Sequence, residues 1–115
     1  MLSYVISMTK MDPEEFARAT PEARRAQLLG VWEIGVLGLD WLEDLVTAER
    51  AEKLADGGFP HRYVTRIRHL RHLFEGGGVP GVGPFSRLHH AELHPDRIDS
   101  SGDDEPVTVE AWDQS

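Results

Sequence analysis

The longest apolar stretch of the chain, LLGVWEIGVLGLDWLEDLV at residues 28–46, constrains the fold most, because its side chains have to be buried. At 100° per residue, its large apolar side chains occupy most of a helical circumference. This pattern predicts a central, mostly buried helix. Glycines 30, 35 and 38 each cost about 1 kcal/mol of helix propensity relative to alanine. They either allow the close approach of a helix or strand, or mark a break into two helices.

The helices are expected to begin where a capping side chain precedes a proline, at Asp12-Pro13 and again at Thr20-Pro21. The first helix is brief, and the second start leads into helical structure that continues to about Asp56. Gly57 and Gly58 follow as its stop signal.

Three acidic residues, Glu33, Asp40 and Asp44, share a narrow stripe on this helical projection. The stripe is interpreted as a solvated edge, as a surface that pairs with a basic helix, or as a carboxylate site.

The stretch HRYVTRIRHLRHLFEGGG, residues 61–78, carries four arginines and three histidines in an otherwise acidic chain. As a helix over 61–75 it would bury Tyr63, Val64, Ile67, Leu70, Phe74 and, less centrally, Leu73, and turn its histidines toward solvent. The candidate partner- or anion-binding residues are Arg62, Arg66, His69 and His72. An ordinary solvated face and a contact with acidic residues are the alternative interpretations.

A second group of histidines lies in RLHHAELHPDRI, interpreted as a strand over about 87–94. Alternate strand residues point the same way, so His90, Glu92 and His94 could present nitrogen and oxygen ligands to a divalent metal. No fourth ligand is identified, and a surface strand is the alternative. The preceding GGGVPGVGP, residues 76–84, is a loop, and a lid over a site is one role considered for it.

Strands are also expected at residues 2–9 and 107–112, which alternate or are rich in β-branched residues. The expected fold is a single α+β domain over 1–115. A small, largely antiparallel sheet packs against two or three helices in the order β-α-α-α-β-β.

Charge is distributed in blocks, with net values of −5 over residues 1–58, +4 over 59–90 and −7 over 91–115. A net charge of −8 argues against binding to nucleic acid or anionic membranes. The basic segment is instead expected to lie against acidic segments of the same fold or of a partner. The chain has no cysteine, no secretion signal and no run of 18 apolar residues, so a cytoplasmic protein outside the membrane is expected.

Two segments, Gly58-Phe59-Pro60-His61-Arg62-Tyr63 and Val107-Thr108-Val109-Glu110-Ala111-Trp112-Asp113, resemble segments of uncharacterised small actinobacterial proteins. The resemblance covers about a third of the chain and implies no activity.

The main hypothesis is a non-catalytic binding or regulatory protein, such as an immunity protein, that recognises a protein of complementary charge without a cofactor. The alternative is a small histidine-based metal-dependent enzyme or metal-binding protein using His69, His72, His90 and His94. A third hypothesis is an anion or nucleotide binder that uses Arg62, Arg66 and the glycine loop. Apolar side chains that remain exposed on the central helix could equally form a homodimer.

Overall fold

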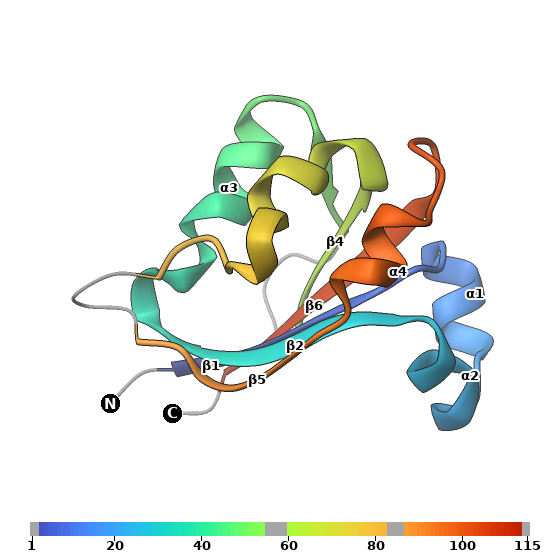
Figure 1. Cartoon of the computed structure of the whole chain (residues 1–115), viewed down its shortest axis with the longest axis horizontal. Coiled ribbons are helices and arrows are strands. Elements are labelled where there is room, and N and C mark those ends of the chain that lie inside the picture. Colours follow the sequence, from blue (N-terminus) through green and yellow to red (C-terminus); the bar gives the residue numbers. More distant parts are fainter. Residues whose placement is uncertain (1–2, 55–59, 83–86, 114–115) are drawn as a thin grey trace.

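The computed structural model describes residues 3–54, 60–82 and 87–113, in which six antiparallel strands form one sheet in the order β3-β4-β6-β1-β2-β5 (Figure 1). The strands are β1 (Ser3–Thr9), β2 (Leu28–Gly35), β3 (Ala51–Lys53), β4 (His61–Arg66), β5 (His89–Leu93) and β6 (Pro106–Asp113). The helices are α1 (Pro13–Arg18), α2 (Pro21–Ala26), α3 (Asp40–Thr47) and α4 (Pro95–Asp99), with 3-10 turns η1 (Val36–Leu39), η2 (Ile67–His69) and η3 (Arg71–Gly77). The α+β class and the antiparallel sheet are confirmed.

Helices α1 and α2 begin where their capping residues predict. Asp12 accepts a hydrogen bond from the Glu15 amide at 2.8 Å, and Thr20 accepts one from the Ala23 amide at 3.1 Å. Each satisfies an amide that the first helical turn leaves without an intrahelical partner. The strands expected at 2–9 and 107–112 are observed as β1 and β6.

The expected helix over 28–46 is wrong in its first half, because Leu28–Gly35 is the strand β2. Gly30, Trp32 and Ile34 are buried while Val31 and Glu33 are half-buried, which is the alternation of a strand. A Cβ at Gly30 would lie 2.8 Å from the Leu93 side chain, so the glycine permits the close approach of β5. Between residues 28 and 54 only Asp40–Thr47 is α-helical, and the proposed stop at residues 57–58 lies outside the described part of the chain.

The expected helix over 61–75 is also wrong, because His61–Arg66 forms β4 and only short 3-10 turns follow. Tyr63, Ile67, Leu70 and Phe74 are buried, as the helical projection expects. Tyr63 enters the core from a strand, however, and its neighbour Val64 lies on the opposite face of the sheet. These side chains are therefore buried as expected, but they come from a strand and 3-10 turns and not from one helix.

The two faces of the sheet have different surroundings. The inner face, covered by α3, η2, η3 and α4, holds the main core (Figure 1). This core includes Ile6, Trp32, Ile34, Trp41, Leu42, Tyr63, Ile67, Leu70, Phe74, Val107 and Val109. Within the described ranges, the opposite face, here called the outer face, is covered only at one end, where α1 and α2 lie. Among the described residues, no helix is long and apolar enough to cross a membrane.

Candidate functional site

A hollow of about 290 Å³ lies on the outer face where α1 and α2 meet the strands. Ser7, Val31 and Glu110 from three adjacent strands form its floor, and Phe16, Arg24 and Arg25 form its helical wall. Register explains the floor, because Ser7 pairs with Val31 on one side and with Glu110 on the other. The hollow therefore combines apolar surface with charged groups of both signs.

Glu110 is the buried charge of this face, with 8% of its side chain exposed. Arg62 lies directly opposite it on β4 and donates two hydrogen bonds to Glu110 Oε2, from Nη2 at 2.6 Å and from Nε at 3.1 Å. The other oxygen, Oε1, accepts no hydrogen bond from the described residues. Arg62 is thus held in the fold by an acidic residue of the C-terminal segment.

The helical wall of the hollow is held by two further arginines. Arg24 donates from Nε and Nη2 to the Phe16 carbonyl at 3.0 and 2.7 Å, and its guanidinium lies 4.1 Å from the centre of the Phe16 ring. This stacked arrangement joins α2 to α1. Arg25 donates to Glu92 Oε1 at 2.9 Å, which ties α2 to β5.

Glu92 also contacts His94, whose Nε2 lies 2.8 Å from Glu92 Oε2. The hydrogen bond with His94, together with that from Arg25, holds the pKa of the Glu92 carboxyl below its ordinary value. The Arg25–Glu92–His94 chain thus favours the ionised carboxylate.

The structure brings two of the proposed metal ligands together, Glu92 and His94, but does not group His90 with them. His90 has φ of +48° at a bulge in β5, where the pairing with β2 shifts between Val31 and Glu33. The extra residue breaks the alternation that would align His90 with Glu92. Across residues 3–54, 60–82 and 87–113, no three His, Asp or Glu side chains are grouped to hold a metal ion.

The four proposed partner- or anion-binding residues divide between two surfaces. Arg62 points to the outer face, and Arg66, at the end of the same strand, donates to the Asp104 carbonyl at 2.6 Å. His69 and His72 lie in the 3-10 turns over the inner face, where His69 is half-buried and His72 is exposed. Burial, followed by the nearby charges of Arg68 and Arg50, lowers the pKa of His69. Residues 83–84 of the proposed glycine lid lie outside the described residues.

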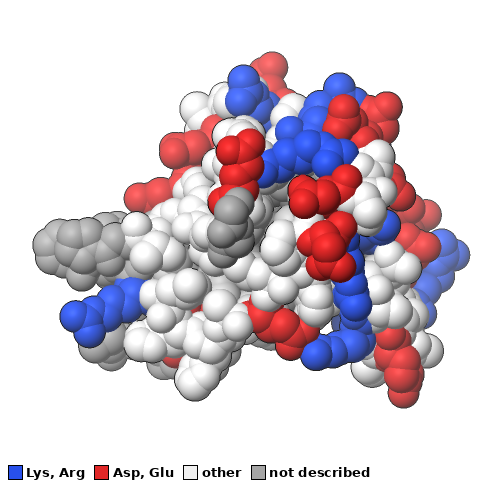
Figure 2. Space-filling model, in the orientation of Figure 1, with Lys and Arg blue, Asp and Glu red and all other residues white. Residues whose placement is uncertain are grey.

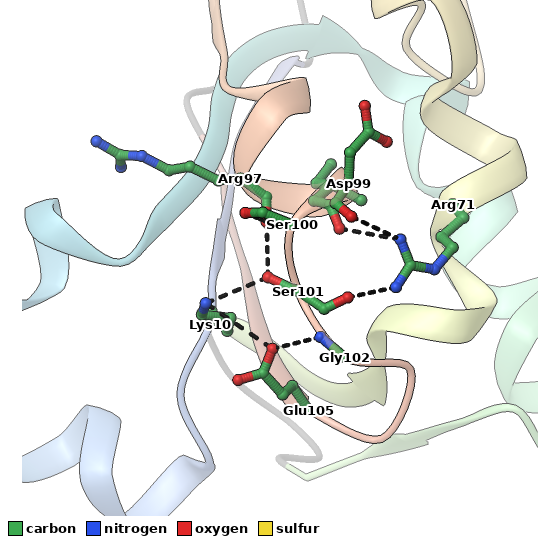
Figure 3. Close-up of polar contacts among 9 residues, drawn as sticks. Lys10, Arg71, Arg97, Asp99, Ser100, Ser101, Gly102 and Glu105 are labelled. Carbon is green, nitrogen blue, oxygen red and sulfur yellow. Dashed lines mark hydrogen bonds and ion pairs between the residues drawn. The ribbon is translucent and has the colours of Figure 1, made fainter.

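The basic segment is compensated mainly by the acidic loop at residues 99–105. Arg71 donates to the carbonyl of Ile98 at 3.1 Å, to that of Ser101, and to Asp103 Oδ1 at 2.8 Å. Arg68 forms an ion pair with Asp104. Figure 3 shows the Arg71 guanidinium held against the carbonyls of this loop. The +4 and −7 blocks of the sequence therefore meet within one molecule.

The other side of the same loop is fixed by Lys10, which donates to Ser101 Oγ at 3.2 Å and lies 3.8 Å from Glu105 Oε2 (Figure 3). Glu105 Oε2 also accepts a hydrogen bond from the Gly102 amide at 2.8 Å. A cleft of about 620 Å³ opens between these groups and α2. Of the charged residues that line it, Lys10 and Glu105 hold the loop.

Carboxylates without ion pairs gather over α3. Asp40 and Asp44 are exposed and join no ion pair with a described residue, whereas Glu43 contacts Lys53 at 3.4 Å. Figure 2 shows acidic atoms over α3, while acidic and basic atoms lie side by side over η3, α4 and the loop at 99–105. Glu33, expected in one stripe with Asp40 and Asp44, lies instead on β2. The helical stripe is therefore corrected to an acidic surface of α3 alone.

Sequence reasoning overlooked Glu110, Arg24, Arg25 and the role of Arg71. The alternation of residues 107–112 places Val107, Val109 and Ala111 on one face, so Glu110 belongs to the other. Its partner Arg62 is 48 residues away in sequence, and only the strand order brings them together.

No protein-family model, curated protein or solved structure matches this chain.

Proposed function

We propose that this chain is a non-catalytic binding protein that recognises a basic protein partner through an acidic surface, as an immunity protein or a regulatory partner does. The observation that carries the proposal is the internal compensation of the basic segment. Arg62, Arg68 and Arg71 are paired with acidic residues of the C-terminal segment. The net charge of −8 is therefore expressed on other surfaces.

The surface of α3 is the proposed contact. Trp41, Leu42 and Leu45 bury one side of this helix in the core, which fixes the opposite side in place. Asp40 and Asp44 lie on that opposite side, one turn apart. Carboxylates on a helix that is fixed in place attract a basic partner toward the surface and determine its orientation. The proposal includes a cytoplasmic location and requires no cofactor.

The test is affinity capture from a lysate of the source organism with the full chain as bait. At 50 mM NaCl we expect one stoichiometric basic protein, identified by mass spectrometry. Asp40→Asn/Asp44→Asn should reduce its capture. The matched control, Glu14→Gln/Glu22→Gln, removes the same charge from exposed positions on α1 and α2 and should leave capture unchanged.

Salt gives a second readout, because it screens exposed charges. The screening distance is roughly 10 Å at 0.1 M salt and roughly 3 Å at 1 M salt. Capture should fall steeply at 500 mM NaCl. A partner retained equally at both salt concentrations, or by the α3 variant, contradicts recognition through this surface. The absence of any stoichiometric partner contradicts the binding function.

A further inference from the structure

The outer face carries an exposed indole beside the hollow. Trp112 is 45% exposed and pairs in register with Val5, whereas Glu110, two residues earlier on β6, forms part of the hollow's floor. Val31 and Val64 share this face. The solvated face of an antiparallel sheet ordinarily alternates polar residues with the buried ones. Trp112 is instead exposed in register with Val5, and tryptophan is a residue type enriched at protein interfaces.

The edges of the sheet are poorly suited to binding another strand. The edge strand β3 has three residues, and the other edge strand, β5, contains the bulge at His90. Short and bulged edges prevent the addition of further strands. A partner would therefore cover the outer face itself.

We propose that a second copy of this chain covers the outer face. Residues that pair across neighbouring strands form rows, and Glu110 and Trp112 belong to successive rows of the outer face. A two-fold axis that is parallel to the sheet and perpendicular to the strands passes between these two rows. It places the Trp112 row of each copy over the Glu110 row of the other. Each Trp112 then lies over the hollow of the other copy. The hollow, at about 290 Å³, is open to receive a bulky side chain from above. Both halves of the contact occur on one face, as an isologous dimer requires.

The charges on this face fit the same two-fold arrangement. Glu33 lies in the row of Trp112, because both residues pair with Val5, and it joins no ion pair with a described residue. Arg24 and Arg25 line the hollow. The exchange of rows brings Glu33 of one copy toward the arginines of the other, so the contact is complementary to itself. Helix α3 lies on the other side of the sheet, and the dimer leaves its acidic surface free.

The test measures mass by light scattering after gel filtration between about 1 and 200 µM. We expect the mass to rise from 12.9 kDa to twice that value. Trp112→Ala removes the indole, and Ser7→Phe fills the hollow from its floor. Each variant should weaken the dimer by at least about 10-fold. Val82→Ala, which removes exposed apolar surface outside the sheet, should leave it unchanged.

Mixing the two weakened variants provides the sharper measurement. The Ser7→Phe copy keeps its indole and the Trp112→Ala copy keeps its hollow, so the mixture regains one of the two contacts. It should dimerise more tightly than either variant alone. Thermal unfolding confirms that each variant folds.

Raising NaCl from 50 to 500 mM should not weaken the dimer, because the indole contact is apolar and because salt that screens the attraction between Glu33 and the arginines also screens the repulsion between two copies of charge −8. This result separates the dimer from salt-sensitive binding to a basic protein. A monomer at every concentration overturns the proposal. So does a dimer that both variants leave intact, or a mixture that regains nothing.

Discussion

Arg62 lies opposite Glu110 in the β4–β6 pairing and directs two donors, at 2.6 and 3.1 Å, to one oxygen of that buried carboxylate. The pair joins the basic segment of the sequence to its acidic C-terminal block. Most of the Glu110 side chain is shielded from water, whereas about a third of Arg62 is exposed. The arginine thus serves as the main counter-charge of a group that water cannot fully solvate.

Removing Arg62 should therefore be costly. Arg62→Met leaves Glu110 buried without its counter-charge, and we expect the free energy of unfolding to fall by about 2 kcal/mol. Urea denaturation measures this change. Adding Glu110→Met should recover part of the loss, because the uncompensated charge disappears. Arg68→Ala, which breaks an exposed pair, should cost less than about 1 kcal/mol. Equal losses for Arg62→Met and Arg68→Ala contradict this account.

Arg71 should control the order of the acidic loop at 99–105. Its guanidinium binds several carbonyls and one carboxylate at once. Lysine has a single cationic centre and cannot reproduce this geometry. We expect Arg71→Ala and Arg71→Lys each to lower the free energy of unfolding by about 2 kcal/mol and to speed hydrogen exchange of the loop amides. Arg87→Ala, at an exposed position, is the control. Full protection of the loop in Arg71→Lys would show that charge alone suffices.

Local sequence signals were sufficient to predict the starts of the first two helices, α1 and α2, and the last strand, β6. The Asp12-Pro13 and Thr20-Pro21 starts predict α1 and α2 because a cap and a proline act within one helical turn. Residues 107–112 predict β6 because their alternation has a period of two. The sequence therefore predicts the α+β class.

Strands β2 and β4 were expected as helices because periodicity alone does not distinguish a short buried strand from a buried helix. Apolar residues dominate Leu28–Gly35, and the neighbouring strands of the sheet bury them. The propensity cost of Gly30 was the available signal. Likewise, Ile67, Leu70 and Phe74 are spaced as in a helix, although 3-10 turns bury them.

The candidate site was predictable only in part. The sequence places Arg62 and the Glu92–His94 pair among the candidates but cannot join them, because their proximity to the hollow depends on strand order and on the position of α2. A single bulge at His90 likewise removes the alignment on which the metal hypothesis depends.

The Glu92 carboxyl should titrate below its ordinary pKa of about 4.3. His94→Ala should raise this pKa toward the ordinary value, and Arg25→Ala should do so less, because the hydrogen bond with His94 is the larger cause. Carbon-detected NMR of the side-chain carboxyl measures the midpoint. Since the folded pKa is depressed, the stabilising contribution is present above the unfolded pKa and is lost as pH falls through the folded value. His89→Ala is the control, and an unchanged midpoint in His94→Ala contradicts the assignment.

Tyr63 should make stability fall at alkaline pH. Its ring is buried and its hydroxyl donates to Glu43 Oε1 at 2.8 Å. Burial, followed by the hydrogen bond and negative charge of Glu43, raises the pKa of the Tyr63 phenol far above its ordinary value. The unfolded chain releases this proton near pH 10, while the folded chain retains it. The stabilising contribution is therefore complete below about pH 10 and is lost progressively as pH rises toward the folded value.

Urea denaturation between pH 9 and 11.5 measures this dependence. The free energy of unfolding should decline with a slope that approaches about 1.4 kcal/mol per pH unit for the one retained proton. Tyr63→Phe should remove that part of the slope, at the cost of the Glu43 hydrogen bond at neutral pH. Tyr4→Phe, which changes the only other tyrosine of the chain, should preserve it. If Tyr63→Phe declines as steeply as the unsubstituted chain, another group retains the proton in the folded state.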